Sequence, residues 1–296
     1  QNWISILIFF LNYSLLIIID KNININYVIS SQMYIHNFNP ILINLGFIEI
    51  RWYSIAYIVG ILIGWWLGKK ILTFKIKTQK ISVSNNDFDD LISYIILGII
   101  IGGRLGYVIF YNLIFYINNP INILKIWEGG MSFHGAVVGV IFMTYIFAKQ
   151  KKTNVFIFLD IIAAVSPIGL FFGRIANFIN SELYGNPSNV IWSVIFQKID
   201  NVPRHPSQLY EACLEGIVLF IILIFISFNS KIKNGLTSVL FLILYGLFRI
   251  FSEQFREPDI QIGYLFNTFS MGAFLSFIMI LGGFLIIFKK KDEIFK

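Results

Sequence analysis

The stretch VFIFLDIIAAVSPIGLFFG, residues 155–173, determines the class of fold. A helix that crosses the hydrocarbon core of a bilayer needs about 20 mainly apolar residues, and this stretch has that length and character. Six further stretches share these properties, so the sequence predicts an all-α, polytopic integral membrane protein with seven transmembrane helices. The other six are residues 47–68, 91–111, 132–148, 206–228, 235–251 and 263–288.

The composition of the whole chain agrees with this prediction. Of its 296 residues, 57% are hydrophobic and 13% are charged, whereas soluble domains have about 45–50% apolar and about 25% charged residues. In a soluble protein the formal charge of +7 could indicate nucleic acid as a partner. Here the lysines form short clusters between apolar runs, which suits anionic lipid headgroups. We therefore expect membrane lipids as partners and no nucleic acid.

The lysine clusters also predict the orientation, because Lys and Arg are enriched in the cytoplasmic connections of membrane proteins. They follow the first, third, fifth and seventh predicted helices. This alternation places the chain before residue 47 outside the cell and the C-terminus in the cytoplasm. The clusters are Lys69, Lys70, Lys75, Lys77 and Lys80; Lys149, Lys151 and Lys152; Lys231 and Lys233; and Lys289, Lys290 and Lys291.

Residues 3–19, WISILIFFLNYSLLIII, form an eighth apolar run that polar residues interrupt at 12–14. Three interpretations are open: an extra helix, an uncleaved signal-like segment, or translated upstream sequence. We favour the last, because Met33 opens a segment that reads as a natural start. The chain then consists of an N-terminal extension, residues 1–32, and a seven-helix transmembrane domain, residues 33–296.

Three arginines lie in or at the outer ends of apolar runs: Arg104, Arg174 and Arg249. A charged side chain at the centre of a bilayer costs at least about 2.5–3.5 kcal/mol, so each requires a reason. His134 opens the third predicted helix on the same side. Guanidinium groups match phosphate oxygens and keep their charge when desolvated. The set therefore predicts a site for an anionic phosphodiester near the outer face.

A structural explanation of each residue remains open. Each arginine could snorkel to the interface or pair with a carboxylate, and His134 could be an ordinary hydrogen-bonded residue. The lone Cys213, inside the fifth predicted helix, is expected to be inert core rather than a nucleophile. The candidate carboxylate partners are Glu182, Glu253 and Glu257.

Metal and cofactor chemistry have no support in the sequence. A single cysteine allows neither a disulfide nor a CxxC pair. The histidines at positions 36, 134 and 205 lack zinc-ligand spacing, and no carboxylate cluster offers a cage for a hard cation. The glycines at 102 and 106 follow no strand and form no GxGxxG nucleotide loop. We expect no metal and no cofactor.

Glycines recur every four residues at three places, a spacing that lets membrane helices approach closely. We expect these glycines to mark helix-packing surfaces. Residues 174–204 look different: they predict an irregular outer, periplasmic loop with a short amphipathic piece at 192–196, lining a cavity. The glycines are Gly60, Gly64 and Gly68; Gly102 and Gly106; and Gly135 and Gly139.

Seven segments, in the same order and with compatible spacing, resemble the prolipoprotein diacylglyceryl transferase family. The resemblance covers the chain from about residue 34 to 288. Two positions depart from the family's pattern, because Ala136 and Ala176 stand where the family usually has glycine, and the loop between Gly185 and Arg204 is short for the family. The segments are RWYSIAYIVG, GGRLGYVIFYN, WEGGMSFHGAVVG, GRIANFINSELYG, RHPSQLYEACLEG, YGLFRIFSEQFREPD and SMGAFLS.

The resemblance implies a seven-helix enzyme of the bacterial inner membrane. Such enzymes transfer the diacylglyceryl group of phosphatidylglycerol to the lipobox cysteine of a prolipoprotein signal peptide, forming a thioether and releasing glycerol phosphate. It implies that Arg174 and Arg249 hold the phosphate and that His134 is a site residue. The other implied site residues are Tyr245, Asn177, Glu182, Tyr53 and Gly185. In the mechanism that we expect, Arg256 or Arg104 assists at the phosphate.

The reaction makes two demands on such a site. Only the thiolate of a cysteine is strongly nucleophilic, and a free thiol has a pKa near 8.5, so the site must favour loss of the proton. His134 is the candidate base, although a nearby arginine could favour the thiolate by itself. The alternative from another class is a transporter of an anionic solute, but the two halves of the chain show no internal repeat. A non-catalytic scaffold would leave the arginines unexplained.

Overall fold

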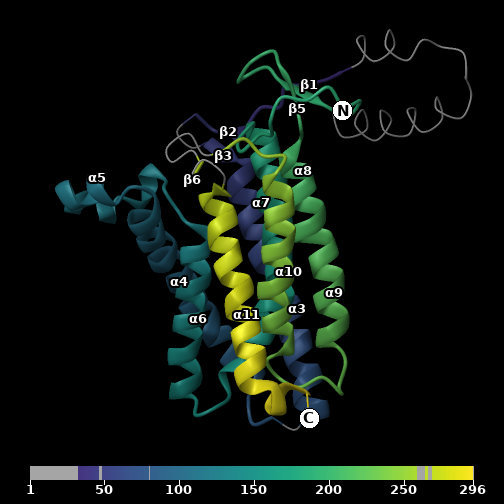
Figure 1. The fold of residues 1–296 in the computed structure, drawn as a ribbon. Coiled ribbons are helices and arrows are strands. Elements are labelled where there is room, and N and C mark those ends of the chain that lie inside the picture. The colour runs from purple at the N-terminus through teal and green to yellow at the C-terminus, as the bar shows by residue number, and fades with distance from the viewer. Residues whose placement is uncertain (1–32, 47–48, 80, 259–263, 266–268, 296) are drawn as a thin grey trace, which may run out of the picture.

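The computed structural model describes residues 33–46, 49–79, 81–258, 264–265 and 269–295 (Figure 1). The N-terminal extension, residues 1–32, lies outside the described residues. Seven helices in the described chain are long and apolar enough to cross a membrane, which confirms the predicted fold class. They are α3 (Trp52–Gln79), α4 (Asn85–Tyr111), α6 (Phe133–Gln150), α7 (Val155–Asn180), the α8–η3–α9 span (Ser207–Ser227), α10 (Leu236–Glu253) and α11 (Met271–Phe295).

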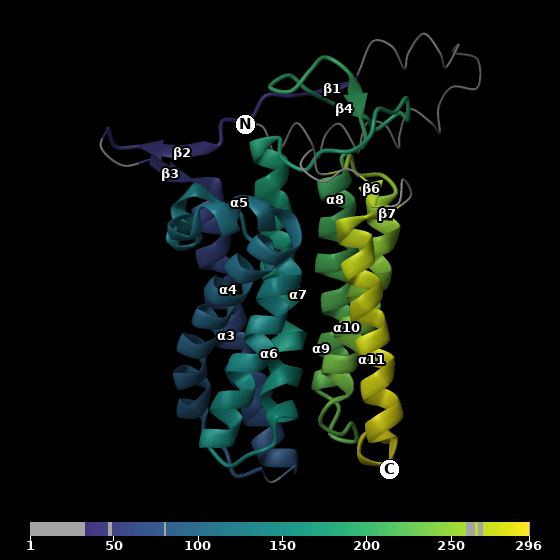
Figure 2. The same ribbon diagram turned by 60° about the vertical axis from the view of Figure 1, so that its left-hand side comes forward.

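Short elements gather at one end of the bundle, called the strand end below (Figures 1 and 2). Strand β4 lies between β1, with which it pairs in parallel, and β5, with which it pairs antiparallel. The strands are β1 (Tyr34–His36), β2 (Ile41–Asn44), β3 (Glu49–Arg51), β4 (Val194–Phe196), β5 (Pro203–Arg204), β6 (Tyr264–Leu265) and β7 (Phe269–Ser270), and the short helices are α5 (Leu113–Asn118), η1 (Pro120–Leu124) and η2 (Ile126–Glu128).

Several of the predicted boundaries are wrong; the second helix, for example, begins at Asn85 instead of residue 91, and the seventh at Met271 instead of residue 263. Residues 49–51 form strand β3, so the first helix begins at Trp52 instead of residue 47. Helix α7 continues past residue 173 to Asn180, so the irregular segment starts later than predicted. Within that segment, residues 194–196 form a strand on β1 rather than an amphipathic piece of their own. In each case hydropathy marks the apolar stretch, whereas backbone hydrogen bonds determine where the element ends.

The lysine clusters gather at the opposite end of the bundle, called the lysine end below. Helix α4 begins there with a capping box, in which the Ser84 hydroxyl accepts from the Asp87 amide and the Asp87 carboxylate accepts from the Ser84 amide. Lys151, after α6, pairs with Asp87 at 2.6 Å. On α3, Lys69 pairs with Asp89 at 2.8 Å. These pairs join the ends of three helices.

Helices α4 and α6 meet along a seam of glycines, as the spacing predicts. The backbones lie so close that a Cβ atom at Gly102 would overlap the carbonyl oxygen of Gly135 and the Cα atom of Gly139. Gly98 and Gly106 face the same two glycines. Ala136 does not lie on this seam: it lines the cavity between the helices, so its extra methyl group leaves the close approach intact.

Helix α7 is the central element of the bundle, because it contacts α3, α9 and α10. A Cβ atom at Gly60 of α3 would lie 3.1 Å from the Cα atom of Gly169 in α7, so these two helices also pack at a glycine. Figure 2 shows α3, α4, α6 and α7 grouped on one side and α8 to α11 on the other. The site described next uses residues from both groups.

Candidate active site

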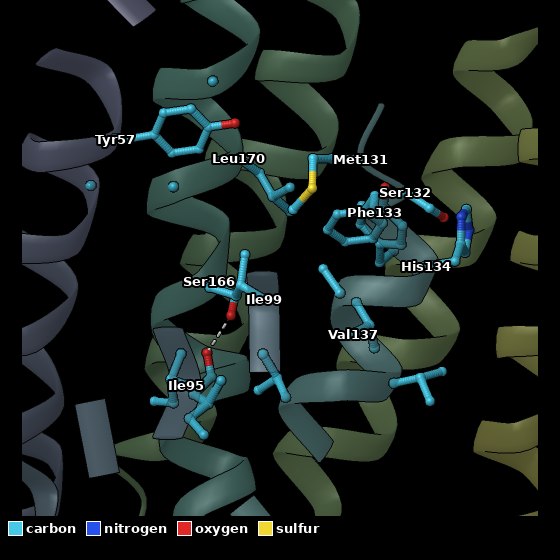
Figure 3. A pocket seen from close by; sticks show the side chains of 18 of the residues that line it. Tyr57, Ile95, Ile99, Met131, Ser132, Phe133, His134, Val137, Ser166 and Leu170 are labelled. Carbon is cyan, nitrogen blue, oxygen red and sulfur yellow. Dashed lines mark hydrogen bonds between the residues drawn. The ribbon is translucent and has the colours of Figure 1, made fainter. Parts of the chain in front are cut away.

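A cavity of about 1930 Å³ lies between helices α3, α4, α6, α7, α10 and α11. Most of its wall is apolar; Figure 3 shows Ile95, Ile99, Val137 and Leu170 around it. Ordinary small-molecule pockets measure about 300–1,000 Å³. The larger volume and the apolar wall suit a ligand with long hydrocarbon chains. Charged side chains reach the cavity near the strand end.

Arg174 of α7 and Arg249 of α10 both line the cavity and are held by carboxylates. The Nε atom of Arg174 lies 2.7 Å from Oε2 of Glu211, and an Nη atom of Arg249 lies 2.8 Å from Oε1 of the same residue. One carboxylate therefore bridges the two guanidinium groups. Arg174 also pairs with Glu215 at 3.2 Å, and Arg249 with Glu253 at 2.5 Å.

Glu211 and Glu215 are site residues that the sequence analysis missed. Their side chains are 1% and 0% exposed. Both project from the α8–η3–α9 span, at the point where α8 (Ser207–Glu211) passes into a π-helical segment, η3 (Ala212–Val218). Such π-helical turns occur often at functional sites. The sequence did contain a signal for them: two carboxylates lie four residues apart in an apolar span, where they need buried cationic partners.

The expectation that arginines pair with carboxylates is confirmed for Arg249, which contacts Glu253. Arg174 instead pairs with Glu211 and Glu215 of the α8–η3–α9 span. Arg256 lies 3.9 Å from Glu253. The cluster thus contains three arginines and three glutamates, and its formal charge is zero. Since an unpaired buried charge is costly, this neutrality is what allows the arginines to lie inside the bundle.

His134 and Tyr245 lie deeper in the same wall. The Nε2 atom of His134, in the first turn of α6, is 3.3 Å from the Ser276 hydroxyl of α11. Tyr245, one turn before Arg249, is 1% exposed, and its ring stacks on Phe241 with centroids 5.7 Å apart. Figure 3 shows His134 beside Phe133 and Ser132. The structure thus brings His134 and Tyr245 to the cavity that contains the arginines.

Tyr53, Asn177, Glu182 and Arg256 also line the cavity. Asn177 stands one turn after Arg174 and is 4% exposed. Among the described residues, its Oδ1 atom is buried and has no hydrogen-bond partner. A buried acceptor without a partner is costly in a finished fold, so this atom is available to a ligand.

Arg104 and Gly185 are not among the residues that line the cavity, and their role as substrate contacts stays a prediction. Arg104 donates to five backbone carbonyl groups of the segment that follows α5, and so holds that segment against α4. A Cβ atom at Gly185 would overlap the carbonyl oxygens of His205 and Phe255, so glycine is needed where three chain segments cross. The Arg104 acceptors are the carbonyl oxygens of Asn122, Ile123, Lys125, Gly129 and Gly130.

Cys213 is exposed on the surface of the bundle, so its expected place in the core is wrong. The reason is rotational: Glu211 and Glu215 face inward from the same span, and the residue between them faces the opposite side. The thiol therefore faces away from the arginine–glutamate cluster.

At the strand end, next to the turn that follows α7, His36 of β1 is completely buried. Its Nδ1 atom lies 3.1 Å from the hydroxyl of Ser181, the C-cap residue of α7. Burial, with a smaller effect of the Lys198 charge, lowers the pKa of His36 to about 4. The ring is therefore neutral near pH 7, and it supports the turn that carries Asn177 and Glu182.

Comparison with known proteins agrees with this geometry. A model of the family described as prolipoprotein diacylglyceryl transferase matches residues 40–289. The phosphatidylglycerol–prolipoprotein diacylglyceryl transferase of Rickettsia bellii is 52% identical over 255 residues, which cover 86% of this chain and 95% of the relative. The enzyme of the same name from Rickettsia akari is 53% identical over 253 residues, covering 84% of this chain and 96% of the relative. The chain therefore belongs to the prolipoprotein diacylglyceryl transferase family.

Proposed function

We propose that this protein transfers the diacylglyceryl group of phosphatidylglycerol to a cysteine thiol of prolipoproteins in the bacterial inner membrane. Relatives that carry this activity in their name match at about half identity over nearly their whole length. The observation that carries the proposal is the meeting of Arg174 and Arg249 at an apolar cavity. The cavity suits the acyl chains, and the arginines suit the phosphate.

In the proposed reaction, the sulfur atom attacks C3 of the glyceryl group. A C–S bond forms, the C–O bond to phosphate breaks, and glycerol phosphate leaves with the electron pair. Negative charge grows on the phosphate, and donors that are already fixed in place stabilise it without further reorganisation. Glu211 fixes the two guanidinium groups relative to each other. Arg256 is placed to assist from the strand end.

The thiol proton must leave before or during the attack. His134 lines the cavity, and its Nε2 atom faces a hydroxyl group rather than a carboxylate. A neutral imidazole in this position can accept the proton, so we assign His134 as the base. Asn177, Glu182, Tyr53 and Tyr245 are proposed to bind and orient the two substrates.

The cysteine substrate is proposed to be that of the lipobox, presented by a signal peptide that enters from the membrane. The strand end is proposed to face the periplasm, and the lysine end with the C-terminus the cytoplasm. The distribution of lysines supports this orientation. Transport of an anionic solute is not favoured, because the relatives named above are transferases.

The test is transfer of radiolabelled diacylglycerol from phosphatidylglycerol vesicles to a lipobox peptide by the purified protein. We expect Arg174→Ala and Arg249→Ala each to lose at least about 100-fold in rate. Arg51→Ala is the matched control, because Arg51 is exposed at the strand end and, among the residues that the structure describes, forms an ion pair with Glu49 alone. Near-normal transfer by either cavity variant would refute the phosphate clamp. Movement of solute without transfer would support the transporter.

A further inference from the structure

A lysine and an aspartate are buried together at the lysine end, far from the proposed site. Lys75 of α3 and Asp160 of α7 have side chains 4% and 0% exposed, and their charged atoms are 3.4 Å apart. Lys75 also donates to Asn234 at 2.8 Å. Neither residue lines the cavity, so the proposed reaction does not use them directly. Two buried ionisable groups in a membrane protein require a reason.

The contacts of Asp160 provide that reason, because its carboxylate caps helix α10. Oδ2 accepts from the amide of Gly235 at 2.7 Å, and Oδ1 accepts from the amide and the hydroxyl of Ser238 at 2.9 and 2.6 Å. Gly235 is the N-cap residue of α10, and it has no side chain with which to cap. In an ordinary capping box, two side chains of one segment accept from the N-cap and N3 amides. Here one carboxylate from another helix accepts from both.

This cap joins the two helices that carry the proposed phosphate clamp. Arg174 and Arg249 each lie fourteen residues beyond the joined positions, Asp160 and Gly235. Fourteen residues of α-helix span about 21 Å. Since α7 and α10 also meet through Glu211 at their other ends, they run in the same direction. Because both arginines lie the same number of residues from the contact between Asp160 and Gly235, their guanidinium groups reach the same depth in the bundle.

We propose that Asp160 is a positioning residue that fixes the axial register of α10 against α7, and so places Arg249 level with Arg174. The proposal rests on the proposed function of the two arginines. A slip of α10 by one residue would move Arg249 by about 1.5 Å. That displacement exceeds the roughly 0.5 Å tolerance of a preorganised site. Glu211 could then no longer bridge both arginines with short contacts.

The axial position of α10 relative to α7 can be measured with a pair of spin labels. Thr78 on α3, which packs against α7, and Leu247 on α10 are both exposed, do not line the cavity and lie near opposite ends of the bundle, so the distance between them changes when α10 slips along its axis. Cysteines at these two positions, in a Cys213→Ser background, report the relative position of α7 and α10. In Asp160→Ala we expect the mean distance to shift, or its distribution to broaden, by about 1.5 Å or more. We expect kcat to fall by about 10- to 100-fold, with the KM for phosphatidylglycerol within about twofold.

Two milder variants keep the test valid if Asp160→Ala does not fold. Ser238→Ala removes one of the three donors, and Asp160→Asn keeps the shape but loses the charge. We expect the change in label distance and the fall in kcat to be largest in Asp160→Ala, smaller in Asp160→Asn and smallest in Ser238→Ala. Asp90→Asn is the matched control, since Asp90 is 60% exposed on α4 and should leave distance and kcat unchanged.

The outcomes separate this inference from the proposed function. An unchanged distance in folded Asp160 variants overturns the register role, and so does a changed distance without loss of kcat. A loss of kcat at unchanged distance overturns it as well. If the distance changes as expected but Arg174→Ala and Arg249→Ala remain active, the proposed clamp fails while the structural role of Asp160 stands.

Discussion

Glu211 shows how one residue can control two others. It forms ion pairs with Arg174 and with Arg249, which belong to helices that are far apart in sequence. Its own charge is tolerated in the interior because both partners are cationic. The geometry of the clamp therefore depends on a residue that does not line the cavity.

Glu211→Gln should abolish most of the transfer activity. The amide keeps the volume but cannot balance two guanidinium charges, and breaking a buried ion pair by removing one partner costs about 3–5 kcal/mol. We expect a loss of at least about 100-fold in transfer rate, because the two guanidinium groups lose the carboxylate that fixes them relative to each other. Initial rates of the purified protein measure this, with exposed Glu49→Gln as control. Wild-type rates in Glu211→Gln would show that the bridge is dispensable.

His36 should make the protein less stable in mild acid. Its pKa in the folded protein, about 4, lies below the ordinary value of 6.5, so the unfolded chain binds the proton more readily. The free energy of unfolding should therefore fall as the pH drops from about 6.5 toward 4, by up to about 3 kcal/mol. Above pH 6.5 this residue should contribute no pH dependence.

Unfolding of the detergent-solubilised protein between pH 4 and 8 tests the His36 prediction. His36→Asn should lower the stability near pH 7 but flatten the dependence on pH. His205→Asn is the comparison, because His205 is only partly buried and should leave most of the slope in place. An equal slope in wild-type protein and His36→Asn would assign the acid sensitivity to other groups.

At the scale of helices, apolar length predicted all seven spans, but it could not predict where α7 ends. Hydropathy stops at Arg174, whereas the helix continues for six more residues to Asn180, because Arg174 finds Glu211 and Glu215 in the interior. A charge that is balanced by a distant segment is invisible to a local pattern. For the same reason the sequence indicated the arginines and missed their main partners.

Two glycines, one on the seam between α4 and α6 and one outside it, give predictions of opposite sign. Gly102→Ala should destabilise the protein by about 1–3 kcal/mol, because the new methyl group would force α4 away from α6. Gly282→Ala in α11 meets open space, so it should be neutral or stabilising by up to about 1 kcal/mol through helix propensity. Thermal unfolding of both variants measures this. A Gly102→Ala protein as stable as Gly282→Ala would show that the helices can separate without cost.

At the scale of the whole molecule, the two ends of the bundle differ in chemistry. The strand end has the arginine–glutamate cluster beside the cavity, and the lysine end has exposed lysines paired with Asp87 and Asp89. The lysine pattern was visible in the sequence. The cavity was not, because it arises from six of the described helices, whose packing depends on contacts between distant residues.

Cysteine labelling in intact cells tests the proposed orientation. In a Cys213→Ser background, a cysteine in place of Asn201, exposed at the strand end, should react with a membrane-impermeant maleimide from the periplasm. A cysteine in place of Ser230, exposed at the lysine end, should react only after the inner membrane is opened. The reverse pattern would invert the topology and place the site on the cytoplasmic side.

Arg104 has a consequence for how this sequence can vary. One side chain, through five carbonyl acceptors between residues 122 and 130, adds to the few backbone bonds of the short 3-10 helices η1 and η2 that order this segment. The acceptor residues contribute only main-chain oxygens to these bonds, so the side chains of Asn122, Ile123 and Lys125 can vary, whereas Gly129 and Gly130 need glycine for their φ angles of 86° and 77°. Much of the order of residues 122–130 therefore depends on Arg104, and a substitution at this one position would remove all five side-chain hydrogen bonds together.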